Sequence, residues 1–282
     1  MPELPEVEIT ARLLSAAVAG AGVESTLAPG VNALKTFDPP LHALDGSRLT
    51  GVSRRGKHLV VESDTGLGLL IHLMSAGRLQ LFDRRAGLRD RTSRVLIRLE
   101  GGRELRLREF GTKQAAWAKL LRAGELEDEE AVATLGPEAW PDPPPFLPLL
   151  GRQPRPLHSL LRDQRVIAGI GRSWVDEILW EARLSPFKRG ADLSEQEALA
   201  LRDATVARLG EAIDAYAATL SLPLPDKLPL PLKVHRHEGQ PCPRCGTTLE
   251  AVHFEDYVIA YCPTCQTDGR VLKDRRLSRL LK

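Results

Sequence analysis

The segment CPRCGTTLEAVHFEDYVIAYCPTC (residues 242–265) holds all four cysteines of the chain, in two C-x2-C pairs. Cys242 and Cys245 form the first pair, and Cys262 and Cys265 form the second after sixteen intervening residues. This spacing is typical of a site in which four thiolates bind one Zn²⁺ ion tetrahedrally. Two disulfides are the alternative, which an intracellular compartment disfavours. The segment therefore predicts one structural zinc ion, a β-hairpin between the pairs and no open metal position for catalysis.

Positive charge is concentrated in two other parts of the chain, although the net charge is only +2. Residues 84–108 contain nine arginines and three acidic residues, and residues 268–282 contain six basic and two acidic ones. Such segments suit a polyanion, or they form an ordinary solvated surface. The chain does not begin like a signal peptide and has no apolar run of membrane-spanning length. We therefore expect a cytoplasmic protein that contacts no membrane.

Apolar periodicity and Pro-rich stretches divide the chain into three parts. Residues 1–125 are β-rich, with alternating segments at 58–61, 67–73, 95–99 and 104–107 and turns at Gly66, Gly77 and Gly101–Gly102. Residues 135–222 are helical, with helices predicted over 158–169, 173–184 and 194–220. Ser173 and Asp176 suit a capping box. Residues 234–282 form the cysteine-bearing part with its basic tail, after the Pro-rich linker 222–233.

The first ten residues, MPELPEVEIT, predict a helix. Pro5 suits its first position, and Glu6 and Glu8 suit its first turn, where the helix dipole favours carboxylates. Apolar residues from Val7 to Leu14 recur at helical spacing and predict a buried face.

Pro2 adds a chemical possibility. Removal of Met1 would make the Pro2 nitrogen a terminal secondary amine, and α-amino groups have pKa values of about 7.7–8.0, so a useful fraction is unprotonated at neutral pH. Such an amine can attack a sugar C1′ atom and form an iminium (Schiff-base) intermediate that permits elimination. The neighbouring Glu3 could pass protons to and from the sugar. If Met1 is retained, this chemistry is blocked.

Five motifs in order resemble the formamidopyrimidine-DNA glycosylase / endonuclease VIII (Fpg/Nei) family of bifunctional DNA repair enzymes. They are PELPEVE (2–8), RRGKHLV (54–60), LGPEA (135–139), IAGIGRSWVDEILWEARLSPF (167–187) and the two cysteine pairs. The resemblance covers essentially the whole chain. It implies a multi-domain α+β fold: an N-terminal antiparallel β-sandwich with flanking helices, a helix–two-turn–helix domain and a zinc-finger β-hairpin. It also implies damaged DNA as the partner and Zn²⁺ as the cofactor.

The resemblance implies roles for individual residues. Pro2 would be the nucleophile, Glu3 the general acid/base with Glu6 assisting, and Lys57 a phosphate-binding residue in a β-turn. The lesion nucleotide would be flipped into a pocket between the domains. Two loops, 72–77 and 108–111, would fill the gap that it leaves. The side chains that we expect to contact DNA from these loops are His72, Ser75, Arg108 and Phe110.

The chain departs from the family pattern at four of these positions. Ser75 stands where typical Fpg enzymes have a methionine, and Glu109 replaces the second arginine of their RRFG segment. With the stretch LKTFDPP (34–40) and the basic tail, these changes point to an endonuclease VIII-like bacterial branch. They shift the expected substrate toward oxidised pyrimidines and further-oxidised guanine products.

Arg172 and Tyr257 are the other two departures. Arg172 occupies the place of a phosphate-binding asparagine, and Tyr257 that of a basic residue in the finger. Because arginine makes charge-assisted, often bidentate contacts with phosphate, we expect Arg172 to supply the cation that the finger has lost. We expect Tyr257 to keep a hydroxyl donor. A decayed paralogue that turns over poorly is the alternative.

The sequence thus predicts a bifunctional DNA glycosylase and apurinic/apyrimidinic (AP) lyase of base excision repair. It would remove oxidised bases through a Schiff base at Pro2 and nick the strand by β,δ-elimination. We expect a monomer in a bacterial cytoplasm, associated with the nucleoid through its DNA. The alternative is a non-catalytic or weakly active lesion-sensing DNA-binding paralogue. A zinc-ribbon transcription accessory protein would explain the tail but not the first ten residues.

Overall fold

The computed structural model describes residues 1–87, 90–111, 114–254 and 257–272, so most of the predicted basic tail lies outside it. The chain forms two compact units. The first comprises Met1–Thr134 and Ile213–Pro229, and the second comprises Leu135–Ala212 and Leu230–Lys282. The helical and cysteine-bearing parts of the sequence therefore share one unit. The three predicted domains, residues 1–125, 135–222 and 234–282, stay a prediction.

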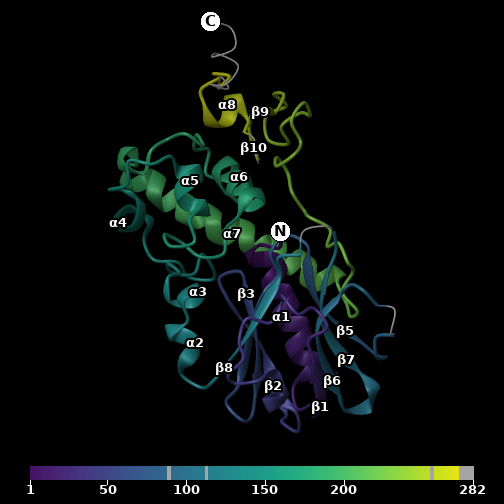
Figure 1. Ribbon diagram of the computed structural model, residues 1–282. Coiled ribbons are helices and arrows are strands. Elements are labelled where there is room, and N and C mark those ends of the chain that lie inside the picture. Colours follow the sequence, from purple (N-terminus) through teal and green to yellow (C-terminus); the bar gives the residue numbers. More distant parts are fainter. Residues whose placement is uncertain (88–89, 112–113, 255–256, 273–282) are drawn as a thin grey trace, which may run out of the picture. The chain divides into compact units, whose positions relative to one another are not determined.

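The first unit contains two four-stranded antiparallel sheets and helix α1 (Leu4–Val18) (Figure 1). One sheet has the strand order β1-β6-β7-β5, and the other has the order β2-β3-β4-β8. The strands are β1 (Val23–Leu27), β2 (Leu49–Arg55), β3 (His58–Ser63), β4 (Gly68–His72), β5 (Gly77–Phe82), β6 (Ser93–Leu99), β7 (Glu104–Glu109) and β8 (Trp117–Leu121). The short helices are η1 (Leu41–Leu44), η2 (Glu100–Gly102), α2 (Glu125–Asp128) and α3 (Glu130–Ala133).

One apolar core joins both sheets and α1. It includes Leu14 of α1, Ile71 of one sheet and Ile97 of the other, all essentially inaccessible to solvent. Each such side chain contributes about 1.5–3 kcal/mol on burial. The sheets pack as the predicted antiparallel β-sandwich, and the expected fold class is confirmed.

Helix α1 begins one residue earlier than predicted. Leu4 is its first residue and Pro5 its second, because Glu3 serves as the N-cap. The Glu6 side chain, in the third position, accepts a hydrogen bond from the Glu3 backbone N–H at 2.8 Å. The predicted apolar face, from Val7 to Leu14, is buried.

The second unit begins with a series of helices. They are α4 (Phe146–Leu150), α5 (Leu157–Arg162), α6 (Arg172–Glu181), η3 (Gly190–Asp192) and α7 (Glu195–Thr219), whose last turns belong to the first unit. Helix α5 ends at Arg162 and not at 169, because Gln164 stabilises a turn. Its side chain accepts a hydrogen bond from Gly169 N–H at 2.9 Å and donates one to Ile170 O at 2.8 Å. The predicted helix over 158–169 was therefore too long.

The cysteine-bearing part forms the predicted hairpin, with β9 (Glu250–His253) paired to β10 (Val258–Tyr261), followed by α8 (Pro263–Gln266). Helix α6 holds it through two buried carboxylates. Asp176 accepts hydrogen bonds from Ala260 N–H at 3.0 Å and His235 Nδ1 at 2.7 Å. Glu177 accepts hydrogen bonds from the backbone N–H groups of residues 233–235.

The capping box predicted from Ser173 and Asp176 is wrong. Helix α6 is capped by Gly171, and the Asp176 carboxylate is directed to the hairpin. None of the helices among the described residues is both long enough and apolar enough to cross a membrane.

Candidate functional site

The start of α1 brings three of the predicted catalytic residues together. Pro2 is partly exposed, and the adjacent Glu3 and Glu6 are 3% and 4% exposed. Both Glu6 carboxylate oxygens are engaged: Oε2 accepts the Glu3 backbone N–H, and Oε1 accepts the Tyr216 hydroxyl at 2.9 Å. Glu6 is thereby fixed in one orientation and fixes the backbone that carries Glu3. We infer that Glu6 positions its neighbours.

Tyr216, in the last turns of α7, is a site residue that the sequence did not reveal. Its side chain is buried, and burial raises its pKa above the ordinary value, with the Glu6 carboxylate beside it adding to the shift. The hydroxyl therefore keeps its proton and remains a donor to Glu6 throughout the physiological pH range. Tyr216 lies 210 residues from Glu6 in sequence. No local pattern could have connected the two.

Lys57 lies in the turn between β2 and β3, where the sequence placed it, and it is 7% exposed. It is close enough to His72, at the end of β4, to affect its protonation. Burial, together with the nearby charges of His58 and Lys57, lowers the His72 pKa to about 3. Because the Met74 backbone N–H donates to His72 Nδ1 at 2.9 Å, the neutral ring carries its proton on Nε2. His72 is thus a neutral hydrogen-bond donor at the end of β4.

The two predicted gap-filling loops are joined in the structure. Phe110 N–H donates to Ala76 O at 3.2 Å, and Gly77 pairs with Glu109 between β5 and β7. Ser75 is exposed in the first loop. Gly77 is the first residue of β5, so the predicted turn at this position is wrong. A side chain is excluded there because a Cβ atom would lie 2.4 Å from a backbone carbonyl oxygen.

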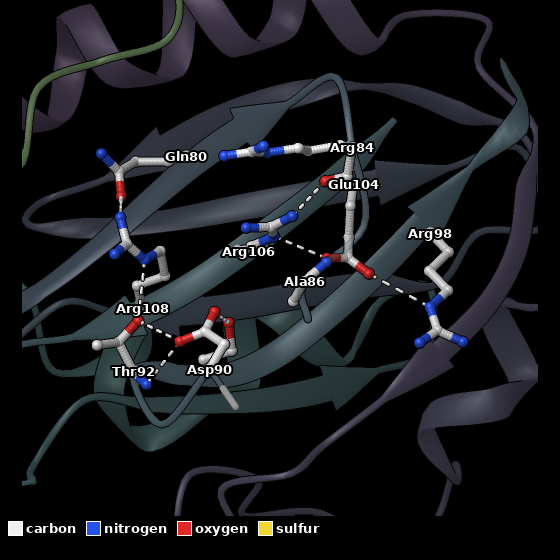
Figure 2. A network of polar contacts seen from close by, with 10 residues as sticks. Gln80, Arg84, Ala86, Asp90, Thr92, Arg98, Glu104, Arg106 and Arg108 are labelled. Carbon is white, nitrogen blue, oxygen red and sulfur yellow. Dashed lines mark hydrogen bonds and ion pairs between the residues drawn. The ribbon is translucent and has the colours of Figure 1, made fainter. Parts of the chain in front are cut away.

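Arg108 is held by several groups of the first unit (Figure 2). Its guanidinium donates to Thr92 Oγ1, Gln80 Oε1 and Asp226 Oδ1, each at 3.0 Å. Its Cζ atom also lies 4.6 Å from the centre of the Phe110 ring. The predicted pair of DNA contacts, Arg108 and Phe110, therefore forms one stacked group at the end of β7.

Glu109, where the family pattern has arginine, is a structural residue. It is 4% exposed and accepts the backbone N–H groups of Ala115 and Ala116 at 2.6 and 2.8 Å. Its carboxylate also lies 3.6 Å from Arg94 Nε. Glu109 thus fixes the chain that follows the second loop.

Two arginines of the arginine-rich segment pair with a buried carboxylate. Figure 2 shows Arg98 and Arg106 beside Glu104, which is fully buried and accepts their Nε–H groups at 3.2 and 2.7 Å. Arg106 also stacks on Phe82, with its Cζ atom 4.2 Å from the ring centre. These two arginines compensate a buried charge, so the sequence count overstated the polyanion-binding surface of this segment.

The second unit brings Arg172 and Tyr257 together. Arg172 is the first residue of α6, and its Cζ atom lies 5.4 Å from the centre of the Tyr257 ring. Arg162, which the sequence did not reveal, lies closer, at 4.3 Å. Tyr257 lies in the turn between β9 and β10, where its ring stacks on Phe254.

The four cysteines form a metal centre. Their sulfur atoms all lie within 4.8 Å of one another, and the closest Sγ–Sγ distances are 3.5–4.0 Å. A tetrahedral Zn²⁺ with bonds of about 2.3 Å needs sulfur atoms about 3.8 Å apart, so the four ligands fit this ion. Trp180 Nε1 donates to Cys242 Sγ at 3.3 Å and links α6 to the centre. The expected single structural zinc and its ligands agree with this geometry.

Three family models match consecutive parts of the chain. The formamidopyrimidine-DNA glycosylase N-terminal domain matches residues 1–112, and the formamidopyrimidine-DNA glycosylase H2TH domain matches residues 141–223. The zinc finger found in FPG and IleRS matches residues 239–267.

Known proteins are similar over nearly the whole length. The formamidopyrimidine-DNA glycosylase of Thermus thermophilus is 35% identical over 95% of this chain and 100% of that protein. The crystal structure of MutM (Fpg) from the same species is 33% identical with a TM-score of 0.80, covering 95% of this chain and 100% of that chain. A complex of Lactococcus lactis Fpg with N7-benzyl-Fapy-dG DNA is 25% identical, with a TM-score of 0.84 over 94% and 100% of the two chains. These relatives do not distinguish an endonuclease VIII-like branch.

Proposed function

We propose a function that follows from two facts: the chain belongs to the formamidopyrimidine-DNA glycosylase family, and it carries Pro2 and Glu3 at the start of α1. It is a bifunctional DNA glycosylase and AP lyase that removes oxidised bases and nicks the strand. The observation that carries the proposal is the fixed start of α1, where Tyr216 and Glu6 orient the backbone of Glu3 beside Pro2.

The reaction begins at the Pro2 nitrogen once Met1 has been removed. Its lone pair attacks the sugar C1′ atom, the C1′–N bond breaks, and the base leaves with that electron pair and a proton. Glu3 moves protons to and from the opening sugar. The resulting iminium acidifies C2′, whose proton is lost as the 3′ phosphate leaves, and a second elimination releases the 5′ phosphate. The zinc ion, closed by four thiolates, stabilises the finger and takes no part in these steps.

Reduction with borohydride tests this mechanism. With DNA that contains an abasic site, the reagent converts the iminium into a stable amine, so the native protein should form a covalent adduct at Pro2. Mass spectrometry should find the free protein lighter than the full chain by one methionine residue. Pro2→Ala should form no adduct, whereas Glu195→Gln, a surface change on α7, should form as much as the native protein. Retained Met1, or trapping by Pro2→Ala, would refute the mechanism and favour a non-catalytic lesion-sensing protein.

The proposed DNA contacts are Lys57 at its turn, the stacked Arg108–Phe110 group with His72 and Ser75, and Arg172 with Tyr257. The relatives named above are formamidopyrimidine-DNA glycosylases, one of them bound to a Fapy-dG derivative. We propose that this chain prefers oxidised pyrimidines and further-oxidised guanine products, on the basis of Ser75 and Glu109. A panel of single-lesion duplexes scored by nicking tests the preference, and faster cleavage of 8-oxoguanine would overturn it.

We also propose that the protein acts as a monomer in the bacterial cytoplasm, on nucleoid DNA. Light scattering of the purified protein at micromolar concentration tests the monomer, and a mass of two chains would contradict it.

A further inference from the structure

Two arginines of the second unit converge on one aromatic ring. Arg162 ends α5, Arg172 begins α6, and Tyr257 lies in the hairpin turn. Their guanidinium carbons lie 4.3 and 5.4 Å from the centre of the Tyr257 ring. The three residues come from three separate elements, so the fold assembles this group.

The Tyr257 ring is itself held in place. Phe254 stacks on it at 4.6 Å between ring centres with an interplanar angle of 8°, and His158 stacks at 5.8 Å and 9°. His158 is 1% exposed and lies 3.4 Å from the Asp176 carboxylate that also anchors β10. The ring therefore offers the two arginines a fixed surface.

The two arginines concentrate positive charge around Tyr257, and the charge of Arg162 has no anionic partner among the described residues. Within the described part of the chain, the Arg162 guanidinium makes no ion pair with a carboxylate, and the adjacent Asp163 pairs with Arg155. Because both guanidiniums lie against one ring, they are less than about 10 Å apart. This distance is roughly one Debye length at 0.1 M salt, so the two positive charges still repel each other. An anion bound by both would relieve that repulsion.

Stacking favours one kind of anion. A guanidinium that lies on an aromatic face is held there by cation–π attraction, and its N–H groups lie in its own plane and not toward the ring. Those N–H groups match the oxygen atoms of a phosphate in bidentate geometry, and less side-chain freedom is lost on binding because the ring already orients them.

We propose that Arg162 and Arg172 form a two-arginine clamp for a DNA backbone phosphate, with Tyr257 as the platform that orients both. The clamp rests on the proposed function, and it adds Arg162 as a phosphate-binding residue. It also changes the role of Tyr257: its ring organises the arginines, and its hydroxyl is dispensable.

Equilibrium binding to a duplex with a non-cleavable abasic analogue tests the clamp. Arg162→Ala should bind about tenfold more weakly, as expected for the loss of a charge-assisted hydrogen bond. The slope of log K against log salt should become shallower by roughly 0.9, the value for one phosphate contact. Arg152→Ala, an exposed arginine outside the cluster, is the matched control and should leave the slope unchanged. Zinc content and thermal melting confirm that each variant is folded.

Changes at Tyr257 separate the ring from the hydroxyl. Tyr257→Phe should bind like the native protein, whereas Tyr257→Ala should weaken binding about as much as Arg162→Ala. An unchanged salt slope in Arg162→Ala, or an equal loss in Tyr257→Phe and Tyr257→Ala, would overturn the clamp. Borohydride trapping of the same variants at saturating protein distinguishes the two proposals: trapping that persists while the clamp fails leaves the glycosylase function standing. Loss of trapping in the native protein would instead refute the function.

Discussion

Replacing Tyr216 with Phe tests the geometry at the start of α1. The change deletes only the hydroxyl that donates to Glu6 Oε1 at 2.9 Å and leaves the buried ring in place. The Glu6 carboxylate, 4% exposed, then loses one of its donors in a buried environment. A buried acceptor left without its partner costs about 1–3 kcal/mol, so we expect the free energy of unfolding to fall by about 2 kcal/mol near pH 8.

The stability difference should depend on pH in a way that identifies Tyr216. Burial and the Glu6 carboxylate raise the pKa of Tyr216 in the folded chain, whereas the unfolded tyrosine loses its proton near about pH 10. Above that pH the unfolded chain binds one proton fewer than the folded chain. The stabilisation is therefore complete below about pH 10 and is lost by about 1.4 kcal/mol per pH unit above it. A difference of about 2 kcal/mol should thus vanish near about pH 11.5.

Urea denaturation of the native protein and Tyr216→Phe, in half-unit steps from about pH 8 to about pH 11, measures both effects. Tyr257→Phe, which removes the hydroxyl of a partly exposed tyrosine in the other unit, is the matched control. Borohydride trapping at saturating DNA should be slower in Tyr216→Phe, because the Glu3 backbone loses part of its support. Equal stability of the two proteins at pH 8, or a difference that stays constant to pH 11, would refute the reasoning.

Three further changes test other parts of the structure. Gly77→Ala should destabilise the protein by about 1–3 kcal/mol because its methyl group would meet a carbonyl oxygen, whereas Gly87→Ala, with open space around it, should not. The His72 pKa of about 3 lies below that of the unfolded chain, so stability should be lost as pH falls from about 6.5 toward 3. His72→Gln should flatten that urea-denaturation profile by about 1.4 kcal/mol per pH unit, and the exposed His42→Gln should not. Removing zinc with a chelator should change the fluorescence of Trp180, which donates to a cysteine sulfur, and an unchanged spectrum would contradict the metal centre.

The elements that the sequence predicted are those set by short-range patterns. The cysteine spacing was sufficient to predict the hairpin between β9 and β10, and alternation was sufficient for β3, β4, β6 and β7. Strands β1, β2, β5 and β8 were missed. Strands β1, β5 and β8 pair with strands far away in sequence, whereas β2 pairs with the adjacent β3 and was missed because its apolar alternation is weak. The start of α1 was misplaced by one residue because Glu3, unusual as an N-cap, takes that position.

The candidate site was predictable only as far as its residues belong to local motifs. Pro2, Glu3 and the cysteines lie within such motifs; the fold gathers the four cysteines as predicted, and the roles of Pro2 and Glu3 stay predictions. Tyr216 and Arg162 contact partners from other elements, and nothing in their own sequence neighbourhood marks them. Long-range contacts of this kind depend on how helices and hairpins pack, which periodicity does not encode.

The number of arginines in a segment could not define the DNA-binding surface, because it does not say which arginines pair with carboxylates of the protein. The buried Glu104 would be costly without compensation, so Arg98 and Arg106 must stay beside it and cannot also bind phosphate. Arg162 differs because an aromatic ring orients it, and among the described residues it pairs with no carboxylate. The physical criterion is therefore the partner of each arginine. Arginines that neutralise a buried carboxylate belong to the fold even where they also stack on a ring, as Arg106 does on Phe82, whereas an arginine such as Arg162, which pairs with no carboxylate among the described residues, is a candidate to bind a polyanion.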